Sequence, residues 1–310
     1  MATLAALGLN AFTTSFAAGS VSVFGLDNYN LITNKPLGND FVSVSGGAYF
    51  AGALRSNGTL AMWGDDTNQE CSSAPTGTFS SYDAGDQFSV ALRTDGSIAA
   101  WGLNNWGQVS TAPSGNDFVQ AKAGGVHGVA LKKDGSIVAW GDAGYGQLNV
   151  PAGNNFIAVD ANSIGNTALR ADGTLVYWGY GGYADVPIPA TAGFVGVNGG
   201  ASFSIAKRAD GSFAVWGQNY AMQVSTAPLD LGFTDFDAGY GLGAAIRSDG
   251  SLVSWGITYA LTSPIAVPST GHYQRVSSGI DNIYAIQSVP EPASLAVLAI
   301  GVLAFRRKRQ

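Results

Sequence analysis

Residues 84–102 read AGDQFSVALRTDGSIAAWG, in which Asp95-Gly96 separates two short apolar runs and Trp101-Gly102 closes the stretch. An Asp-Gly between apolar runs is the strongest short-range signal of a β-hairpin, because a type I′ turn needs positive φ at both central residues and both tolerate it. No window of 11 or more residues within the repeats shows helical spacing of apolar residues. The stretch therefore predicts strands. The same hairpin is predicted at Asn57-Gly58, Asp134-Gly135, Asp172-Gly173, Asp210-Gly211 and Asp249-Gly250.

The Trp-Gly pair that closes this stretch returns every 38 or 39 residues. A fixed period of about 40 residues is typical of stacked structural units, and units made only of strands predict a β-propeller. One large ring at the same place in each unit is expected to fill the gap between neighbouring blades. We therefore expect a structural core role for Trp63, Trp101, Trp140, Trp178, Trp216 and Trp255.

The two ends of the repeat region supply the halves of one more unit. Residues 19–25 match residues 96–102, with Phe24 in the Trp position, and residues 278–287 match residues 84–93. Pairing these ends would also remove free sheet edges, which otherwise invite aggregation. The sequence thus predicts an all-β, seven-bladed β-propeller over residues 18–288, with its first blade closed by N- and C-terminal strands.

Aromatic residues follow the Trp position by four or five places in most units, where exposed loops carry binding residues on a rigid scaffold. Such rings could stack on sugar faces or anchor a protein partner; alternatively, they fill space between blades. A second, more variable set precedes the next strand of the unit. The candidate binding residues are Tyr29, Trp106, Tyr145, Tyr183, Tyr220 and Tyr259 in the first set, and Phe50, Phe88, His127 and Phe203 in the second.

Residues that could support catalysis or bind a metal are few. The chain has two histidines, one cysteine (Cys71), and no Gly-x-Ser-x-Gly or His-Glu-x-x-His motif. We therefore expect no catalytic residues, no cofactor and no metal, and a protein that is not an enzyme. Two alternatives stay open: a hydrolase that uses aspartates across the central opening, and calcium sites at Asp65-Asp66 or at Asp235 and Asp237.

The charge of the chain argues against nucleic acid as a partner. Without the four basic residues of the C-terminal tail and Glu291, the 15 basic and 21 acidic residues fall to 11 and 20, a net charge of −9. Phosphate binding needs clustered Lys and Arg. Six of the remaining cations instead recur at one place before the hairpin turn, which indicates a scaffold role; they are Arg55, Arg93, Lys132, Arg170, Lys207 and Arg247.

Both termini predict export. Residues 4–12 are apolar and Ser15-Phe16-Ala17 offers small residues to a signal peptidase, so residues 1–17 are expected to be a signal peptide remnant, although no basic residue precedes them. Residues 293–305 carry no charge and would span about 20 Å as a helix, against a hydrocarbon core of about 30 Å. We therefore expect residues 289–310 to enter the inner membrane transiently, with the basic residues on the cytoplasmic side.

The units resemble the repeats of the regulator of chromosome condensation family. The shared pattern is Gly-Gly-x-x-His-x-x-Ala-Leu, an Asp-Gly turn, a hydrophobic strand, Trp-Gly and Asn-x-x-Gly-Gln, although the family His is kept only at His127. The short units and the split blade are most similar to secreted bacterial members, such as propeller-type β-lactamase inhibitors. The resemblance implies a propeller; it does not imply inhibition.

The C-terminal residues resemble a PEP-CTERM sorting signal, which is carried here by Pro290, Glu291, Pro292, Arg306, Arg307, Lys308 and Arg309. This resemblance implies cleavage near the Pro-Glu-Pro by a membrane peptidase of the exosortase type. It also implies a final place at the cell surface or in an extracellular matrix rich in polysaccharide. The expected ligand is therefore an extracellular polysaccharide or a secreted or surface protein; a protein inhibitor and a glycan-active hydrolase are the alternatives.

Overall fold

A computed structural model describes residues 18–180, 187–258 and 260–288, and these residues form 21 β-strands and one short 3₁₀ turn, η1 (Asn28–Asn30). The inner strands are β2 (Phe41–Gly46), β5 (Phe79–Ala84), β8 (Phe118–Ala123), β11 (Phe156–Ala161), β14 (Phe194–Gly199), β17 (Phe233–Ala238) and β20 (Tyr273–Ser278). The middle strands are β3 (Phe50–Arg55), β6 (Phe88–Arg93), β9 (His127–Lys132), β12 (Gly165–Arg170), β15 (Phe203–Arg208), β18 (Leu242–Arg247) and β21 (Asn282–Ser288). The outer strands are β1 (Gly19–Gly25), β4 (Leu60–Gly64), β7 (Ile98–Gly102), β10 (Ile137–Gly141), β13 (Leu175–Gly179), β16 (Phe213–Gly217) and β19 (Leu252–Gly256).

These strands form antiparallel sheets that follow the sequence repeat. Five sheets have three strands each, and a sixth has the order β20-β21-β1-β2-β3-β4. Within this sixth sheet, β1 pairs with β21 over seven residue pairs but meets β2 at the single pair Gly19↔Phe41. The two ends of the repeat region thus lie side by side in one sheet, as the sequence predicts.

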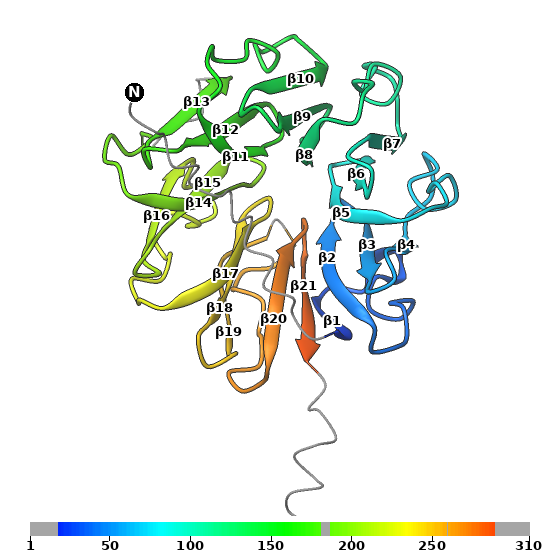
Figure 1. Ribbon diagram of the computed structural model, residues 1–310. Helices are drawn as coiled ribbons and strands as arrows, with labels where there is room; N and C mark the ends of the chain where they lie inside the picture. The colour runs from blue at the N-terminus through cyan, green and yellow to red at the C-terminus, as the bar shows by residue number, and fades with distance from the viewer. Residues whose placement is uncertain (1–17, 181–186, 259, 289–310) are drawn as a thin grey trace, which may run out of the picture.

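The sheets are arranged in a ring (Figure 1). The inner strands contact one another in the order β2, β5, β8, β11, β14, β17 and β20, and β20 contacts β2 again. Each unit also packs against the next through a hydrophobic cluster; six clusters span two neighbouring sheets, and the seventh lies within the six-stranded sheet, between β21-β1 and β2-β3-β4. The fold is therefore all-β and of the propeller type.

The sheets have two distinct ends, which we name from one unit. At the loop face, Gly46 and Phe50 flank the turn from inner to middle strand, and Gly64, which pairs with Phe50, leads into the loop after the outer strand. At the hairpin face, Arg55 pairs with Phe41 and leads into the Asn57-Gly58 hairpin. Since every unit repeats this register, all loops after the outer strands begin on the loop face.

The hairpins form where the sequence predicts them, but the type I′ prediction was wrong. The amide of Gly96 donates to the carbonyl of Arg93 at 2.9 Å, so Thr94 and Asp95 are the central residues, and only Gly96 has positive φ (+88°). This is a type I turn followed by a left-handed glycine. The carboxylate of Asp95 accepts hydrogen bonds from the amide and hydroxyl of Ser97, at 2.9 and 2.7 Å, which holds the Asp in place.

The cation before each hairpin covers the first aromatic ring of the inner strand. The guanidinium of Arg93 lies 5.0 Å from the centre of the Phe79 ring, and the five other units that have a hairpin repeat the contact. In the unit of β14–β16 the residue at this place is Arg208, over Phe194 at 4.7 Å, so the assignment of Lys207 to the repeated place was wrong. Lys207 instead bonds the carbonyls of Phe233 and Thr234 in the next unit.

The tryptophans of the Trp-Gly pairs lie between units. Their side chains are buried, and each indole N–H whose partner is described donates to a main-chain carbonyl in the loop of the preceding unit, at 2.8–3.0 Å. Phe24 takes the Trp place in β1 and packs edge-on against Tyr273 at 6.1 Å. The observed pairs are Trp63 to Leu31, Trp101 to Glu70, Trp140 to Gln108, Trp178 to Gln147 and Trp255 to Gln223.

Several sequence predictions concern residues outside the described ranges. These are the signal peptide remnant at residues 1–17, the sorting segment at 289–310, and the candidate residues Tyr183 and Tyr259. Within the described residues, no helix is long and apolar enough to cross a membrane.

Candidate binding site

Four candidate aromatic residues stand on the loop face with about half of their surface exposed. The exposed fractions are 50% for Tyr29, 59% for Trp106, 51% for Tyr145 and 47% for Tyr220. In the sheet register, each follows an outer strand, so they occupy equivalent loops around one end of the ring (Figure 1). The described members of the first aromatic set are therefore available to a ligand.

Amide side chains within these loops hold them in place, and two of these side chains, Gln108 and Gln147, are buried. The Oε1 atom of Gln108 accepts the amide of Trp106 at 2.9 Å, and Gln147 does the same for Tyr145 at 2.8 Å. The Oδ1 atom of Asn104 accepts two further amides of the same loop, at 3.0 Å each. The Asn-x-x-Gly-Gln part of the repeat is thus a loop-fixing motif, and its amide groups present the aromatic ring on a rigid support.

Three of the exposed rings contact a second aromatic residue or a neighbouring loop. Tyr29 lies 4.8 Å from Tyr49 between ring centres. Tyr145 packs edge-on against Tyr180 at 5.2 Å. The hydroxyl of Tyr220 lies 3.1 Å from Ser202 Oγ and 3.2 Å from the carbonyl of Tyr240.

The second candidate set does not lie on the surface, and this expectation was wrong. Phe50, Phe88, His127 and Phe203 are the first residues of β3, β6, β9 and β15, and all four are buried between sheets. His127 Nε2 pairs with Asn166 Oδ1 at 2.9 Å, and burial lowers the pKa of His127. The sequence prediction starts each middle strand one residue too late, so a core position was taken for a loop position.

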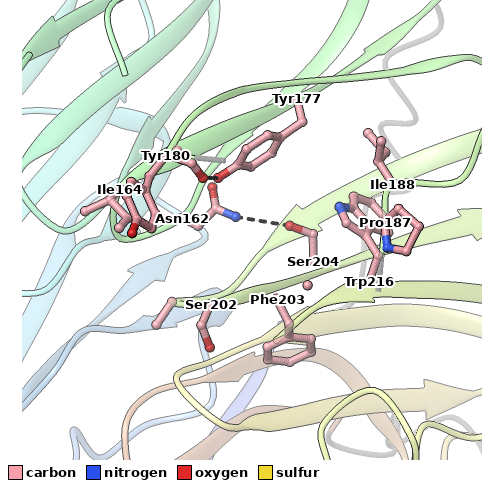
Figure 2. A pocket seen from close by; sticks show the side chains of 13 residues that line it. Asn162, Ile164, Tyr177, Tyr180, Pro187, Ile188, Ser202, Phe203, Ser204 and Trp216 are labelled. Atoms are coloured by element: carbon pink, nitrogen blue, oxygen red, sulfur yellow. Dashed lines mark hydrogen bonds between the residues drawn. The ribbon is translucent and has the colours of Figure 1, made fainter. Parts of the chain in front are cut away.

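A pocket of about 220 Å³ opens on the loop face between the β11–β13 and β14–β16 sheets (Figure 2). Four aromatic side chains contribute to its wall: Tyr177, Tyr180, Phe203 and Trp216. Asn162 lines it on the polar side and donates from Nδ2 to Ser204 Oγ at 3.1 Å. The Tyr177 hydroxyl donates to the Tyr180 carbonyl at 2.8 Å.

Two exposed aromatics of the first set flank this pocket. On one side Tyr145 packs against the pocket residue Tyr180, and on the other Tyr220 bonds the pocket residue Ser202. The pocket and these rings therefore form one continuous region of the loop face. Sequence reasoning missed the pocket, although one signal was present: Gly165 stands where every other unit has a larger residue, which is a Phe or His in four of them.

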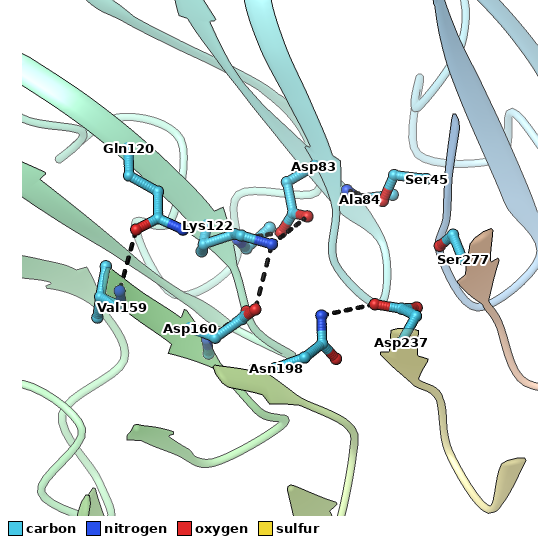
Figure 3. Close-up of polar contacts among 12 residues, drawn as sticks. Ser45, Asp83, Ala84, Gln120, Lys122, Val159, Asp160, Asn198, Asp237 and Ser277 are labelled. Carbon is cyan, nitrogen blue, oxygen red and sulfur yellow. Dashed lines mark hydrogen bonds and ion pairs between the residues drawn. The ribbon is translucent and has the colours of Figure 1, made fainter. Parts of the chain in front are cut away.

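The central channel is lined by the fifth residue of each inner strand (Figure 3). In five of these places the side chain accepts a hydrogen bond from the amide of the sixth residue of the next inner strand. We call these hydrogen bonds between inner strands the belt. Because Ser277 bonds Gly46 in this way, the belt joins the last inner strand to the first. The five bonds are Ser45 to Ala84, Asp83 to Ala123, Asn198 to Ala238, Asp237 to Ser278 and Ser277 to Gly46, at 2.6–3.1 Å.

One lysine breaks the belt and binds the acids of the channel. Lys122 Nζ lies 3.3 Å from Asp83 and 3.2 Å from Asp160. Burial opposes the charged form of Lys122, yet Asp160 and Asp83 together raise its pKa above its usual value. Burial raises the pKa of Asp160, and the nearby ammonium opposes that rise. Burial also raises the pKa of Asp237 to about 8.

The contacts of the aspartates bear on the two alternatives that the sequence leaves open, a hydrolase that uses aspartates and calcium sites. Asp83, Asp160 and Asp237 are all engaged by neighbouring donors, so each has a structural account within the ring. Asp235 binds Arg275 and the amide of Val276. Asp65 binds Thr67, and Asp66 accepts the amides of Cys71 and Ser72. In the described part of the chain, no group of three or more His, Cys, Asp or Glu is placed to hold a metal.

Glycine and alanine residues narrow the channel where it meets the loop face. An added Cβ at Gly85 would lie 2.3 Å from the carbonyl of Gly124, which is too close for any side chain. Across this mouth, Tyr240 hydrogen-bonds Asp86, and burial raises the pKa of both groups. The opening that remains measures only about 60 Å³, so the larger pocket is the better binding candidate.

Comparison with known families agrees with this propeller-type architecture. The model of the regulator of chromosome condensation (RCC1) repeat matches residues 81–108 and 118–147. The model of the PEP-CTERM protein-sorting motif matches residues 288–310. No curated protein matches the chain. The chain therefore carries RCC1 repeats and a PEP-CTERM motif, as its sequence predicts, and this motif indicates an exported protein.

Solved structures share the fold at low sequence identity. Prp20p from Saccharomyces cerevisiae superposes with a TM-score of 0.71 at 16% identity, covering 92% of this chain and 95% of that one. Human WBSCR16 gives 0.70 at 16% identity, with 88% and 100% covered. The ectodomain of the Physcomitrella patens receptor kinase CR4 gives 0.68 at 19% identity, with 81% and 71% covered. These similarities concern the fold alone.

Proposed function

We propose that this protein is an exported propeller that binds a ligand through its loop face and does not catalyse a reaction. The ligand is an extracellular polysaccharide or a secreted or surface protein. The observation that carries the proposal is the set of half-exposed rings of Tyr29, Trp106, Tyr145 and Tyr220, which rigid loops present on one end of the ring. Large exposed aromatics of this kind stack on sugars and anchor protein partners.

The proposal includes a division of the chain. Residues 18–288 form seven blades, of which β20, β21 and β1 make the split one; the seven inner strands and seven interface clusters support this count. Residues 1–17 are a signal peptide remnant. Residues 289–310 are a sorting signal that enters the inner membrane transiently and is cut by an exosortase-type peptidase, an assignment that the family match supports. The mature protein then lies at the cell surface or in the matrix.

Binding is tested with the purified protein on a glycan array and against extracts of the cell envelope. The variants Trp106→Ala and Tyr145→Ala remove two exposed rings, and Leu229→Ala, an exposed residue in a loop that leads to the hairpin face, is the matched control. Glycan binding that is lost in the first two variants and kept in the control supports a polysaccharide ligand. A stoichiometric protein complex with the same sensitivity supports a protein ligand. Binding unchanged in both aromatic variants contradicts the proposal.

Export is tested separately by intact mass and cell fractionation in the native cell. A mature species that ends near Glu291 and lies outside the inner membrane is expected. A variant that lacks residues 289–310 should miss this processing. An uncleaved, cytoplasmic wild-type protein would refute the sorting assignment and leave the binding proposal to the array result.

A further inference from the structure

The pocket beside Tyr180 exists because its unit differs from the others at two places. A small residue stands where other units have a larger one, and a large residue stands where they have a smaller one. Four other units place a Phe or His first in the middle strand, and the remaining two place Leu242 and Asn282 there; the outer strand then has a smaller residue than Tyr, as in Phe88 with Ala100. The β11–β13 unit has Gly165 and Tyr177 instead. An added Cβ at Gly165 would lie 2.2 Å from the Tyr177 hydroxyl, so the tyrosine ring occupies part of the space that a Phe would fill.

The exchange leaves the remaining space empty. The hydrophobic cluster at this interface has only four buried members, Leu169, Phe194, Ala206 and Trp216, and it is the smallest of the seven. Tightly packed interiors avoid such voids, since each void loses contacts and stability. The pocket is thus a departure from the repeat at one interface.

The lining of the pocket defines the chemistry of an occupant. Its wall is largely aromatic and aliphatic, from Tyr177, Tyr180, Phe203, Trp216, Ile164 and Ile188. Its described lining residues include no charged side chain, and burial of an unpaired charge is costly. An uncharged and mainly apolar group therefore fits best.

One polar atom of the pocket wall, Asn162 Oδ1, favours an occupant that donates a hydrogen bond. Asn162 is buried, its Nδ2 donates to Ser204, and its Oδ1 has no hydrogen-bond partner among the described residues. Figure 2 shows this amide between Tyr180 and Ser204 at the pocket wall. A buried acceptor without a partner costs about 1–3 kcal/mol. An occupant that donates a hydrogen bond would remove that cost.

The size of the pocket limits the occupant to one ring. An apolar cavity of about 150 Å³ binds benzene in another protein, and this pocket measures about 220 Å³. The wall is also preorganised, because the Tyr177 hydroxyl is fixed on the Tyr180 carbonyl and burial raises the pKa of Tyr177 to about 12, which keeps it neutral.

We propose that this pocket binds a single aromatic ring that carries a hydrogen-bond donor, such as a phenol or an indole, with Asn162 Oδ1 as the acceptor. The ring belongs to a free small molecule or to the side chain of a polypeptide. This inference adds an enclosed subsite to the proposed loop-face binding site, although neither claim requires the other.

The test measures binding to the full-length protein by ¹⁹F NMR with 4-fluorophenol, and with fluorobenzene as the probe without a donor. The preference for 4-fluorophenol over fluorobenzene should fall about fivefold or more in Asn162→Leu, because that variant loses the acceptor. Competition by N-acetyl-tyrosine amide, compared with its phenylalanine counterpart, distinguishes a polypeptide source from a free small molecule. If the preference is the same in wild type and Asn162→Leu, the assigned acceptor is wrong.

A second variant fills the pocket without disturbing the repeat. The double substitution Gly165→Phe/Tyr177→Ala copies the Phe88 and Ala100 pair, and it should abolish 4-fluorophenol binding while the melting temperature stays the same or rises. Leu229→Ala, which lies outside both the pocket and the set of exposed rings, should leave binding unchanged. Undiminished binding in the filled variant, or no binding by the wild type at millimolar probe, would overturn the inference. These readouts do not depend on the glycan array, so either claim can fail alone.

Discussion

The indole of each Trp-Gly pair both packs between two sheets and donates a hydrogen bond to the preceding unit. Trp140 is buried, lies over Gly128 and bonds the carbonyl of Gln108 at 2.9 Å. Phe24 shows that the packing can be met without the hydrogen bond. The two contributions can therefore be separated by substitution.

We expect Trp140→Phe to lower the free energy of unfolding by about 1–3 kcal/mol, because the buried Gln108 carbonyl loses its donor. Trp140→Ala should cost about 3–5 kcal/mol, since it also leaves a cavity. Urea unfolding of both variants measures the difference. Trp106→Phe, on the exposed loop, is the control and should change stability by less than about 0.5 kcal/mol. A neutral Trp140→Phe would contradict the role of the hydrogen bond.

His127 makes the stability of the ring sensitive to acid. Burial lowers its pKa in the folded protein, so below the ordinary value of about 6.5 the unfolded chain binds a proton that the folded chain does not. Stability should therefore fall as the pH drops from 7.5 to 5. His127→Phe, which copies Phe88 and Phe203, should flatten this dependence, whatever its stability at pH 7.5. An unchanged slope between pH 7.5 and 5 would show that other groups cause the acid sensitivity.

At the scale of the element, strand β1 is held by β21 and by its own alternation of buried and half-buried residues. Val21 and Val23 are buried against Tyr284 and Ile286, while Ser22 points to the other side. Successive side chains of a strand face opposite sides of the sheet, so neighbouring substitutions should differ sharply.

We expect Val21→Asp to release β1, because a carboxylate would be buried without a partner. The loss should be about 3 kcal/mol or more, and amide exchange in β21 should rise. Ser22→Asp adds the same charge one residue away and should cost less than about 1 kcal/mol. Thermal unfolding and hydrogen exchange measure both. Equal effects of the two variants would mean that the split sheet does not depend on this burial.

The sequence predicts the strands, the hairpins and the pairing of the two ends, because these depend on local patterns and on a fixed period. It does not distinguish a type I′ turn from the observed turn, since both place Gly96 in the left-handed region, although the central residues are Asp95 and Gly96 in the first and Thr94 and Asp95 in the second. It places Phe88 and His127 in loops because strand boundaries depend on tertiary pairing. The pocket requires Gly165 and Tyr177 to be seen side by side, which only the fold provides.

At the scale of the whole molecule, Lys122 is the cation that balances the channel. Without it, Asp83 and Asp160 would face each other in the ring with no counter-charge nearby. Removal of one partner of a buried ion pair typically costs about 3–5 kcal/mol. The channel thus links the electrostatics of neighbouring units.

We expect Lys122→Met to destabilise the protein by about this amount at pH 7. The loss of the ammonium should raise the pKa of Asp160 further, so the folded variant gains a proton as the pH falls, and the stability deficit should shrink towards pH 4.5. Melting curves against pH measure this. Lys133→Met, which changes an exposed lysine of the same unit at the hairpin face, should behave like wild type. A deficit that does not change with pH would contradict the electrostatic origin.

The pairing of Gly19 with Ser288 also fixes how the molecule is oriented when it is held by its ends. Both residues lie at the hairpin face, where Gly19 also meets Phe41. The aromatic loops and the pocket lie at the opposite face. Any tether that continues from Ser288 is therefore attached at the hairpin face of the ring. A propeller held in this way points Trp106 and Tyr145 outward, clear of the surface that carries it.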